Sequence, residues 1–353
     1  MNQYNVAVAG ATGAVGTEFI RLLEEREFPL GSLRLLASSR SAGKQITFRK
    51  EKLTVEEMTH DSFQGCDIAF FSAGGARSKE FAPSAVKSGA VVIDNSSAFR
   101  MEPEIPLVVP GINDNDLHDH KGIIANPNCS TIIMLMPLAP LNRLSPVRRV
   151  IVSTYQAASG AGALAMQELI DQTRRSLQGD VLDPKVFPHP IAFNLFSHNS
   201  KVDEDGYNEE ERKMIQESRK ILHNPILRIS PTCIRVPVLR AHSESLNVEF
   251  EHRPSLESVY HALQNAPGVV IVDDRTGNRF PMPIEASGRD EVLVGRIRHD
   301  LSNENAIDLF VCGDQILKGA ALNGFQIAET LIRRGLLENW KRHHELSVAF
   351  HSH

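Results

Sequence analysis

The chain has 353 residues, of which 42% are hydrophobic and 23% charged, with a formal net charge of -5 at pH 7. This length predicts two packed domains, because a single hydrophobic core seldom grows so large. The negative charge argues against a nucleic-acid-binding protein, which usually carries a basic face. No secretory signal precedes the first apolar segment, and no apolar run approaches the roughly 20 residues that span a bilayer. We therefore expect a cytoplasmic protein without a membrane partner.

Apolar strands alternate with amphipathic helices in the first part of the chain. We expect strands over residues 4–9, 33–37, 68–71 and 91–94, and helices over 17–26 and 78–87. Such alternation is typical of a parallel, doubly wound sheet. Residues 1–128 are therefore predicted to form a Rossmann-type, parallel-sheet dinucleotide-binding domain in an α/β protein.

The pattern changes in the second part, where strands outnumber helices. Strand-like runs cover residues 149–154, 233–238, 246–250, 269–272, 292–298 and 308–312. They predict a mixed α+β domain with one large sheet over residues 129–314. A last long helix, over about 315–340, is expected to pack back on the first domain and complete it. We expect the polar, histidine-rich tail over 341–353 to be disordered.

A glycine-rich turn joins the first strand to the first helix. Gly10, Gly13 and Gly16 follow the strand with the spacing GxxGxxG, rather than the commoner GxGxxG. Backbone N–H groups in such a turn can approach a pyrophosphate at the positive end of the helix. An ordinary tight turn between a strand and a helix remains the alternative.

The residues after the second strand indicate which dinucleotide would bind. An NAD site wants a carboxylate there for the ribose hydroxyls, whereas a 2′-phosphate wants hydroxyls and a cation. This chain has Ser38, Ser39 and Arg40 and no nearby carboxylate, which favours NADP. A polar turn without a ligand remains the alternative.

One of the four cysteines stands apart from the others. Cys129 lies in the run NPNCST and directly precedes an apolar segment, whose helix we expect Pro137 and Pro140 to limit. At a helix N-terminus the dipole and free amides lower a thiol pKa, and the amides can stabilise an oxyanion. From spacing alone, a structural or capping role is as good an interpretation. Cys66, Cys233 and Cys312 lie in or beside strands and are expected to be buried small hydrophobes. No paired spacing suggests a disulfide framework or a metal site.

Four further polar residues are candidates for a site. His242 lies just past a strand-like run and has an intrinsic pKa suited to acid–base catalysis, although most histidines are structural. Glu210 and Lys213 share one face of a helix that begins after Asn208, and a solvated, capped helix explains them equally well. Arg100, at the end of DNSSAFR, is a candidate anion ligand.

Taken together, these segments resemble the aspartate-semialdehyde dehydrogenases over nearly the whole chain. The matching runs, in order, are GATGAVG, DNSSAFR, NPNCST, YQAASGAG, GYNEEERKM, PTCIRVPV, HSES and KGAALNGFQIAE. Several motifs in the right order are far more specific than any one of them.

The resemblance implies an NADPH-dependent reduction of aspartyl phosphate to aspartate semialdehyde and phosphate, on the route to lysine, threonine and methionine. It makes residues 129–314 the catalytic and dimerisation domain and implies a homodimer or homotetramer. The implied catalytic residues are the nucleophile Cys129, the acid–base residue His242 and Gln156, which positions the thioester. The implied substrate ligands are Arg235 and Glu210 for the amino-acid end, and Arg100 and Lys213 for the phosphate. The implied cofactor ligands are Gly10, Thr12, Gly13, Ala14, Val15, Ser38, Ser39, Arg40, Ser159, Gly160 and Asn323.

Two residues depart from the family pattern. Gly111 stands where an acidic residue is expected, and Ala241 replaces the glycine that usually precedes the histidine. A methyl group at Ala241 restricts the backbone beside His242, which puts the placement of that histidine in question.

Three competing interpretations stay open. An N-acetyl-glutamyl-phosphate reductase has similar architecture and chemistry, but that family carries a glycine immediately before its cysteine, where this chain has Asn128. A malonyl-thioester reductase would be distinguished by its use of a coenzyme A ester. A catalytically silent paralogue would usually have lost the nucleophile, the histidine or the substrate arginine, all of which are present here.

Overall fold

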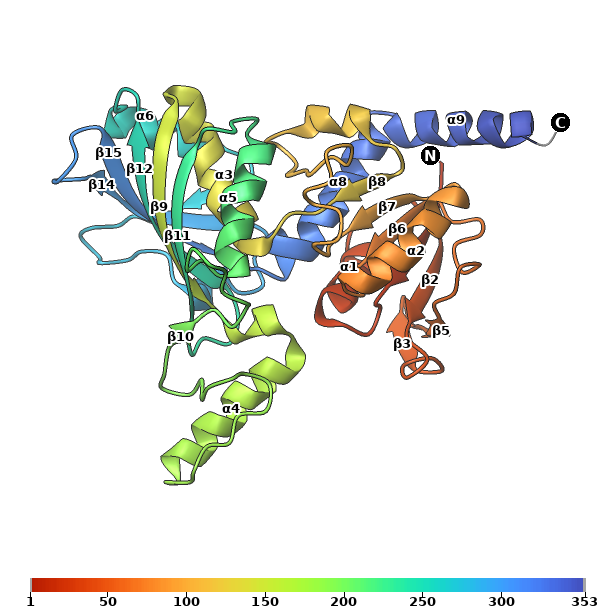
Figure 1. Cartoon of the computed structure of the whole chain (residues 1–353), viewed down its shortest axis with the longest axis horizontal. Coiled ribbons are helices and arrows are strands. Elements are labelled where there is room, and N and C mark those ends of the chain that lie inside the picture. Colours follow the sequence, from red (N-terminus) through yellow and green to blue (C-terminus); the bar gives the residue numbers. More distant parts are fainter. Residues whose placement is uncertain (1, 352–353) are drawn as a thin grey trace. The chain divides into compact units, whose positions relative to one another are not determined.

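The computed structural model describes residues 2–351, which divide into two compact units (Figure 1). The first unit combines Met1–Pro127 with Ala320–His353, and the second is Asn128–Gly319. The chain therefore leaves the first unit once and returns to it near its end.

The first unit is built on a six-stranded sheet in which every pair of neighbours is parallel. Its spatial order is β5-β2-β1-β6-β7-β8, and a short antiparallel hairpin, β3–β4, lies outside it. The strands are β1 (Tyr4–Ala9), β2 (Leu30–Ala37), β3 (Gln45–Phe48), β4 (Glu51–Thr54), β5 (Glu56–Glu57), β6 (Ile68–Phe71), β7 (Val91–Asp94) and β8 (Ile123–Ala125).

Helices cover both faces of this sheet. On one face α1 (Ala14–Glu25) contacts α8 (Leu322–Arg333), and Phe19 of α1 stacks on Phe70 of β6 with 4.4 Å between ring centroids. On the other face Ala82 and Ala85 of α2 (Gly75–Lys87) pack with the neighbours of Phe70 in β6. Successive strand residues point to opposite faces, so β6 is buried on both sides. The predicted doubly wound parallel sheet is confirmed.

The C-terminal part of the chain differs from the expected single helix. It forms a π-helical segment (Leu317–Ala321), then α8, then α9 (Leu336–His351), with Gly335 at φ +68° between α8 and α9. The expected disorder of the tail is wrong as far as His351. Trp340 accounts for the difference: its Nε1 donates to the Gly89 carbonyl at 3.0 Å, and its ring contacts His120. Residues 352–353 lie outside the described residues.

The second unit is built on a seven-stranded mixed sheet with the order β10-β11-β9-β12-β15-β14-β13. β11 runs parallel to β9, whereas β12 is antiparallel to both of its neighbours, β9 and β15. The strands are β9 (Val147–Gln156), β10 (Phe196–Ser197), β11 (Arg228–Arg235), β12 (His242–Phe250), β13 (Val269–Ile271), β14 (Val292–His299) and β15 (Ala306–Gly313). The expected strand over 233–238 ends at Arg235 instead, because the chain there turns through Pro237, which has no N–H to continue the ladder.

Three helices, α3 (Cys129–Leu144), α5 (Glu209–Ile221) and α6 (Leu256–Gln264), pack together against this sheet (Figure 1). Helix α3 continues through Pro137 and Pro140, so the expectation that they limit it is wrong. Each proline removes one backbone hydrogen bond and costs about 3 kcal/mol. Burial of the continuous run from Ser130 to Leu141 offsets that loss. The resulting buried helix holds its N-terminus, and Cys129, against the sheet.

Smaller helices complete the second unit. A 3-10 turn (Ala158–Ala161) follows β9 and leads into α4 (Ala163–Leu177), which projects beyond the end of the sheet beside β10 (Figure 1). α7 (Pro283–Ala286) contacts β15. On the sheet face opposite α3, Ile151 and Tyr155 of the interior strand β9 are 38% and 39% exposed. This face is the less covered of the two.

Candidate active site

The ends of three adjacent strands bring three predicted site residues together. Gln156 ends β9 and pairs in register with Arg235, which ends β11. His242 begins β12, whose Ser243 pairs with the residue before Gln156. All three side chains are at most 3% exposed. The register therefore forms a buried row, Arg235–Gln156–His242, at one edge of the sheet.

Cys129 is the first residue of α3, as the sequence predicts for a residue beside a helix N-cap. Asn128 is the N-cap: its Oδ1 accepts from the Thr131 N–H at 3.1 Å. Its Nδ2 donates to Glu210 at 2.7 Å, and its backbone N–H donates to Glu217 at 2.6 Å. These bonds fix the residue before the thiol from both the side chain and the backbone.

The other cysteines differ from Cys129 in exposure. Cys129 is partly exposed, whereas Cys66, Cys233 and Cys312 are buried, which confirms the sequence prediction for those three. Burial raises the pKa of Cys312 to about 12 and also raises the pKa of Cys66 and Cys233. The three buried thiols are therefore poor nucleophiles at neutral pH.

The π-helical segment lies directly against the thiol residue. A Cβ added to Gly319 would lie 2.9 Å from the Cys129 Cβ and 3.3 Å from its Cα. Any side chain there would have to displace Cys129, because neither contacted atom is the far end of a flexible side chain. Gly319 is a residue that the sequence reasoning did not single out.

We expect Gly319→Ala to lower kcat by about 100-fold, because a displacement near 1 Å can cost that much in an oriented reaction. Steady-state turnover and the rate of Cys129 alkylation by iodoacetamide measure the effect, with circular dichroism as the control for folding. A folded variant with wild-type turnover would show that Cys129 tolerates the added methyl group.

Gln156 and Glu210 connect the sheet to the helices. Gln156 Nε2 donates to Ser130 Oγ at 2.6 Å and to Glu210 Oε1 at 3.3 Å. The Glu210 carboxylate also contacts Lys213 Nζ at 3.3 Å. The side-chain amide oxygen of Gln156, Oε1, is buried and has no hydrogen-bond partner. It is therefore an acceptor that a substrate group can use.

His242 is held in one tautomer. The Ala157 N–H donates to its Nδ1 at 3.0 Å, so a neutral ring carries its proton on Nε2. Burial, followed by the positive charge of Arg235, lowers the pKa of His242 to about 3. The ring is consequently a neutral Nε2–H donor at working pH, and not a group that titrates near the ordinary value assumed from the sequence.

Ala241, which replaces the glycine expected before His242, has an unusual backbone conformation. Ala241 has φ +72°, in the left-handed region that costs a non-glycine residue about 1 kcal/mol. Its N–H donates to Gln315 Oε1 at 3.0 Å, and Gln315 Nε2 donates to Ser159 Oγ. Gln315, which was not predicted as a site residue, thus holds Ala241 in place. It also joins Ala241 to the predicted cofactor ligand Ser159.

The adjacent Gly160 also lies against the buried row. A Cβ added to it would lie 3.1 Å from the His242 ring and 3.2 Å from Arg235 Nη1. The 3-10 turn that carries Ser159 and Gly160 therefore borders the same site as Cys129.

Arg235 retains a hydrogen-bond donor that can bind an anion. Its Nη1 donates to the Ala157 carbonyl at 3.0 Å, and its Nη2 donates to His198 Nε2 at 2.9 Å. Its Nε is buried and has no partner. A carboxylate is the ligand that a guanidinium fork binds best, so this orphan donor suits the predicted role.

A second carboxyl group lies beneath this row. Glu244 is on the same face of β12 as His242, is fully buried, and neither of its oxygens has a hydrogen-bond partner. Burial raises its pKa well above the ordinary value. Its protonation therefore stabilises the fold fully below the unfolded-state pKa of about 4.3, and this contribution is lost as pH rises through the folded-state pKa.

We expect Glu244→Gln, which is neutral at every pH, to be more stable than the wild type at pH 8–9, with the difference shrinking toward pH 5. Thermal unfolding midpoints across this range measure it. The matched control is Glu249→Gln, the same change on the same strand at a partly exposed position. A stability difference that does not change with pH would mean that Glu244 is not held protonated.

The first unit contains the remaining predicted ligands. Gly10, Thr12 and Gly13 lie in the turn between β1 and α1, and Ala14 and Val15 begin α1. Ser38, Ser39 and Arg40 follow β2, the parallel neighbour of β1. The two segments therefore lie at the same edge of the sheet. Gly10 has φ +89°, and an added Cβ would meet the Ser72 backbone at 2.7 Å. The N-cap of α1, Gly13, has no side chain to occupy the first-turn N–H groups.

Arg100 and Asn323 also lie in the first unit. Arg100 Nε donates to the Asn126 carbonyl at 2.9 Å, and its Nη2 donates to the Asn95 carbonyl at 3.0 Å. Asn323, in α8, donates to the Val108 carbonyl at 3.0 Å. Gly111 has φ +87°, which explains a glycine there in place of an acidic residue.

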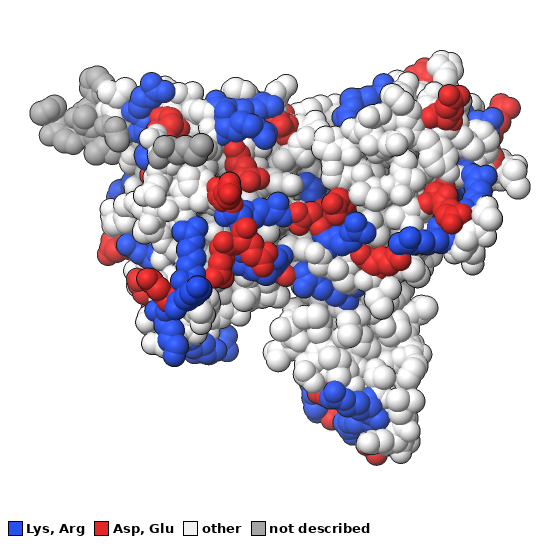
Figure 2. All heavy atoms as spheres, turned by 180° about the vertical axis from the view of Figure 1, so that it is seen from behind, with Lys and Arg blue, Asp and Glu red and all other residues white. Residues whose placement is uncertain are grey.

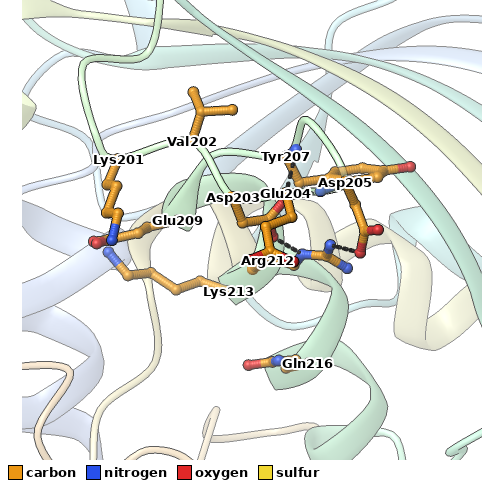
Figure 3. Close-up of a pocket in the computed structure, with 10 residues that line it drawn as sticks. All are labelled: Lys201, Val202, Asp203, Glu204, Asp205, Tyr207, Glu209, Arg212, Lys213 and Gln216. Atoms are coloured by element: carbon orange, nitrogen blue, oxygen red, sulfur yellow. Dashed lines mark hydrogen bonds and ion pairs between the residues drawn. The ribbon is translucent and has the colours of Figure 1, made fainter.

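A surface hollow of about 970 Å³ adjoins α5 in the second unit (Figure 3). Asp203 and Asp205 on its wall are paired with Arg212 at 2.5 Å each, so these three charges are mutually satisfied. Lys213 lines the same hollow and points toward Lys201 and Glu209 (Figure 3). Elsewhere, on the face seen in Figure 2, acidic and basic side chains lie interspersed.

No helix between residues 2 and 351 is long and apolar enough to cross a membrane. Among the same residues, no group of three or more His, Cys, Asp or Glu side chains is arranged to hold a metal ion.

Comparison with known proteins agrees with this architecture. Residues 5–120 match the family model described as semialdehyde dehydrogenase, NAD binding domain, and residues 138–318 match semialdehyde dehydrogenase, dimerisation domain. The fold and the two matches define an oxidoreductase of the semialdehyde dehydrogenase class.

Individual relatives narrow the family further. The chain is 55% identical to an aspartate-semialdehyde dehydrogenase of Synechocystis sp., over 94% of this chain and 98% of the relative. A Vibrio cholerae structure, aspartate semialdehyde dehydrogenase II complexed with ASA, is 42% identical with a TM-score of 0.91, covering 94% and 99% of the two chains. A Candida albicans aspartate semialdehyde dehydrogenase structure with NADP is 26% identical with a TM-score of 0.74, covering 94% and 98%. The chain belongs to the aspartate-semialdehyde dehydrogenase family.

Proposed function

We propose that this protein reduces L-aspartyl 4-phosphate to L-aspartate 4-semialdehyde with NADPH, through a thioester on Cys129, in the biosynthesis of lysine, threonine and methionine. The observation that carries the proposal is the position of Cys129: a partly exposed thiol at the start of α3, in the same unit as the buried row Arg235–Gln156–His242. The free thiols suit a reducing compartment, the cytoplasm.

The first step forms the thioester. The Cys129 thiolate attacks the acyl carbon, the bond from that carbon to the phosphate oxygen breaks, and the leaving phosphate takes up the proton that the thiol has lost. The carbonyl oxygen becomes an oxyanion as the new C–S bond forms. His242 Nε2–H is the neutral donor in the row that stabilises this charge, together with the amides at the start of α3.

The second step releases the aldehyde. NADPH, when held by the proposed cofactor ligands, would supply the hydride that reduces the thioester carbon. The same His242 donor stabilises the second oxyanion, whose collapse to a carbonyl breaks the C–S bond and returns the thiolate. Solvent then reprotonates Cys129, so one proton is consumed in each turnover.

The substrate groups match the charges of the site. Arg235, with its orphan Nε–H, would bind the carboxylate, and the Glu210 carboxylate would bind the amino group. Lys213 and Arg100 would bind the phosphate as cations. Gln156, held through its amide nitrogen by Ser130 and Glu210, presents its carbonyl oxygen to the thioester.

The residues of the first unit fit NADP. The turn from Gly10 to Val15 and the uncapped first turn of α1 offer backbone N–H groups to the pyrophosphate. Ser38, Ser39 and Arg40 offer hydroxyls and a cation to the 2′-phosphate. Ser159, Gly160 and Asn323 complete the proposed cofactor ligands.

We also propose assembly as a homodimer or homotetramer. The matching dimerisation-domain model and the partly exposed Ile151 and Tyr155 on the less covered sheet face support this proposal. Sedimentation of the purified protein tests it.

The decisive experiment follows absorbance of NADPH during oxidation of aspartate semialdehyde with NADP and phosphate. We expect rapid, phosphate-dependent NADPH formation with this substrate, none with N-acetyl-glutamate semialdehyde, and much slower formation with NAD. Activity with only the acetylated substrate would indicate an N-acetyl-glutamyl-phosphate reductase instead. Phosphate-independent reduction would contradict the acyl-phosphate route, and no activity despite cofactor binding would indicate a silent paralogue.

A further inference from the structure

The guanidinium of Arg235 is held by groups from separate segments of the second unit. Its Nη1 donates to the Ala157 carbonyl after β9 at 3.0 Å. Its Nη2 donates to His198 Nε2 at 2.9 Å and, more weakly, to Asn199 Oδ1 at 3.4 Å, both just after β10. The guanidinium also lies 5.5 Å from the centre of the Phe187 ring. Every acceptor in this set is uncharged.

His198 is fixed independently of Arg235. Its backbone N–H donates to the Cys233 carbonyl at 2.8 Å, which extends the β10–β11 pairing by one residue. Because a guanidinium only donates, His198 Nε2 must accept from it. On the other side of the ring, Nδ1 lies 3.1 Å from Ser200 Oγ and 3.3 Å from the Ser200 backbone nitrogen. A neutral ring that accepts on Nε2 carries its proton on Nδ1, and the Ser200 hydroxyl, the nearer of the two, is the group that can accept it. A doubly protonated ring would both lose this acceptor and repel Arg235.

Burial keeps His198 neutral. Burial lowers its pKa to about 4; the negative Glu210 opposes this shift, and the positive Arg235 and Lys213 add to it. The acceptor on Nε2 is therefore present throughout the pH range in which the enzyme would work.

Arg235 needs such a support because an opposite charge lies nearby. The negative Glu210 raises the pKa of Arg235 against the dominant, lowering effect of burial. In the proposed reaction these two residues bind opposite ends of the amino acid, so they must stay apart until the substrate arrives. A guanidinium without neutral acceptors would turn toward the carboxylate and close the substrate site.

We propose that His198 is a positioning residue for substrate binding: it holds Nη2 of Arg235 so that the Nε–H stays available for the substrate carboxylate and Arg235 stays apart from Glu210. The inference rests on the proposed function in one respect, the role of Arg235 as carboxylate ligand. It adds a residue outside the catalytic row, 37 positions from Arg235 in the sequence.

The kinetic test compares His198→Ala with His198→Gln. Removing the acceptor leaves Nη2 of the buried guanidinium with only its weaker contact to Asn199, so we expect His198→Ala to raise the KM for aspartate semialdehyde about 10- to 100-fold. The kcat and the KM for NADP should stay within about threefold of the wild type. His198→Gln should restore most of the affinity, because its amide oxygen can accept from Nη2.

Two further variants separate positioning from a general structural effect. His189→Ala is the matched control, since His189 lies on the same segment and contacts the Phe196 ring rather than Arg235. In an Arg235→Lys background, His198→Ala should add less than about twofold to KM, because neighbours that act through one group are not additive. An unchanged KM in His198→Ala, or equal effects in both backgrounds, would overturn the inference and leave the proposed function standing.

A measurement without turnover keeps the two proposals apart. In protein labelled with ¹⁵N-arginine, NMR reports rotation about the Cζ–Nη2 bond of Arg235, with Arg235→Lys to assign the signal. We expect slow rotation in the wild type and in His198→Gln, and fast rotation in His198→Ala. If the wild type fails to oxidise aspartate semialdehyde, the proposed function falls, and the NMR result still decides whether His198 holds Arg235. Fast rotation in the wild type would overturn the inference.

Discussion

Cys129→Ala is expected to abolish turnover, with a loss of at least about 10⁴-fold in kcat, while NADP still binds. Removal of a nucleophile eliminates the covalent route, and other site groups recover only a small part of the catalysis. The cofactor ligands proposed here do not include Cys129, so the binding constant for NADP should stay unchanged. NADPH absorbance measures kcat, and calorimetric titration measures the binding constant for NADP.

The control for this variant is Cys66→Ala, which removes a buried thiol from the first unit. It should keep turnover within a few-fold of the wild type. Alkylation of the wild type should also reach Cys129 first, because burial raises the pKa of the other three thiols. Residual turnover near the wild-type rate in Cys129→Ala would eliminate the thioester mechanism.

His242→Ala is expected to lower kcat by about 10²- to 10⁴-fold, the range for loss of one positioned proton-bearing group. The loss should fall on kcat rather than on the KM for aspartate semialdehyde, because His242 stabilises charge that develops during reaction. With a pKa near 3, His242 stays neutral from pH 5 upward. The pH profile of the wild-type kcat should therefore show no inflection near pH 6.5 that is due to His242.

The pH dependence of kcat in the two proteins checks this assignment. His60→Ala, a change in the first unit, serves as the control for loss of a histidine. A limb near pH 6.5 in the wild type that disappears in His242→Ala would mean that the residue titrates during turnover and acts as a base.

Local sequence signals predicted the first unit well. The expected strands over 4–9, 68–71 and 91–94 coincide with β1, β6 and β7, because each is a short apolar run bounded by polar or glycine residues. The failures are places where packing overrides local preference. The burial of α3 carries it through Pro137 and Pro140, and Trp340 orders a tail whose composition is polar.

The site was predictable only in part. Cys129 has a helix N-terminus beside it in the sequence, so its position could be inferred from local pattern. The row Arg235–Gln156–His242 depends on the register of β11, β9 and β12, which are far apart in the chain and whose order no periodicity reveals. Gln315 and His198 carry no sequence motif, because each acts through hydrogen bonds to residues that are distant in the sequence. Ala241 was predictable in part. The sequence shows that a glycine is missing before His242, but it does not show that Gln315 holds Ala241 in place.

The path of the chain through its two units has a consequence for biosynthesis. A ribosome delivers the six strands of the first sheet early, but α8, which contacts α1 and β7, emerges only after the entire second unit. The second unit is continuous in sequence and can fold as soon as it leaves the exit tunnel. The nascent first unit must meanwhile wait with the part of α1 that α8 contacts uncovered, including the edge of the Phe19 ring that lies beside Gly324. Chaperone engagement during translation should accordingly concentrate on this early segment and end when the C-terminus is released.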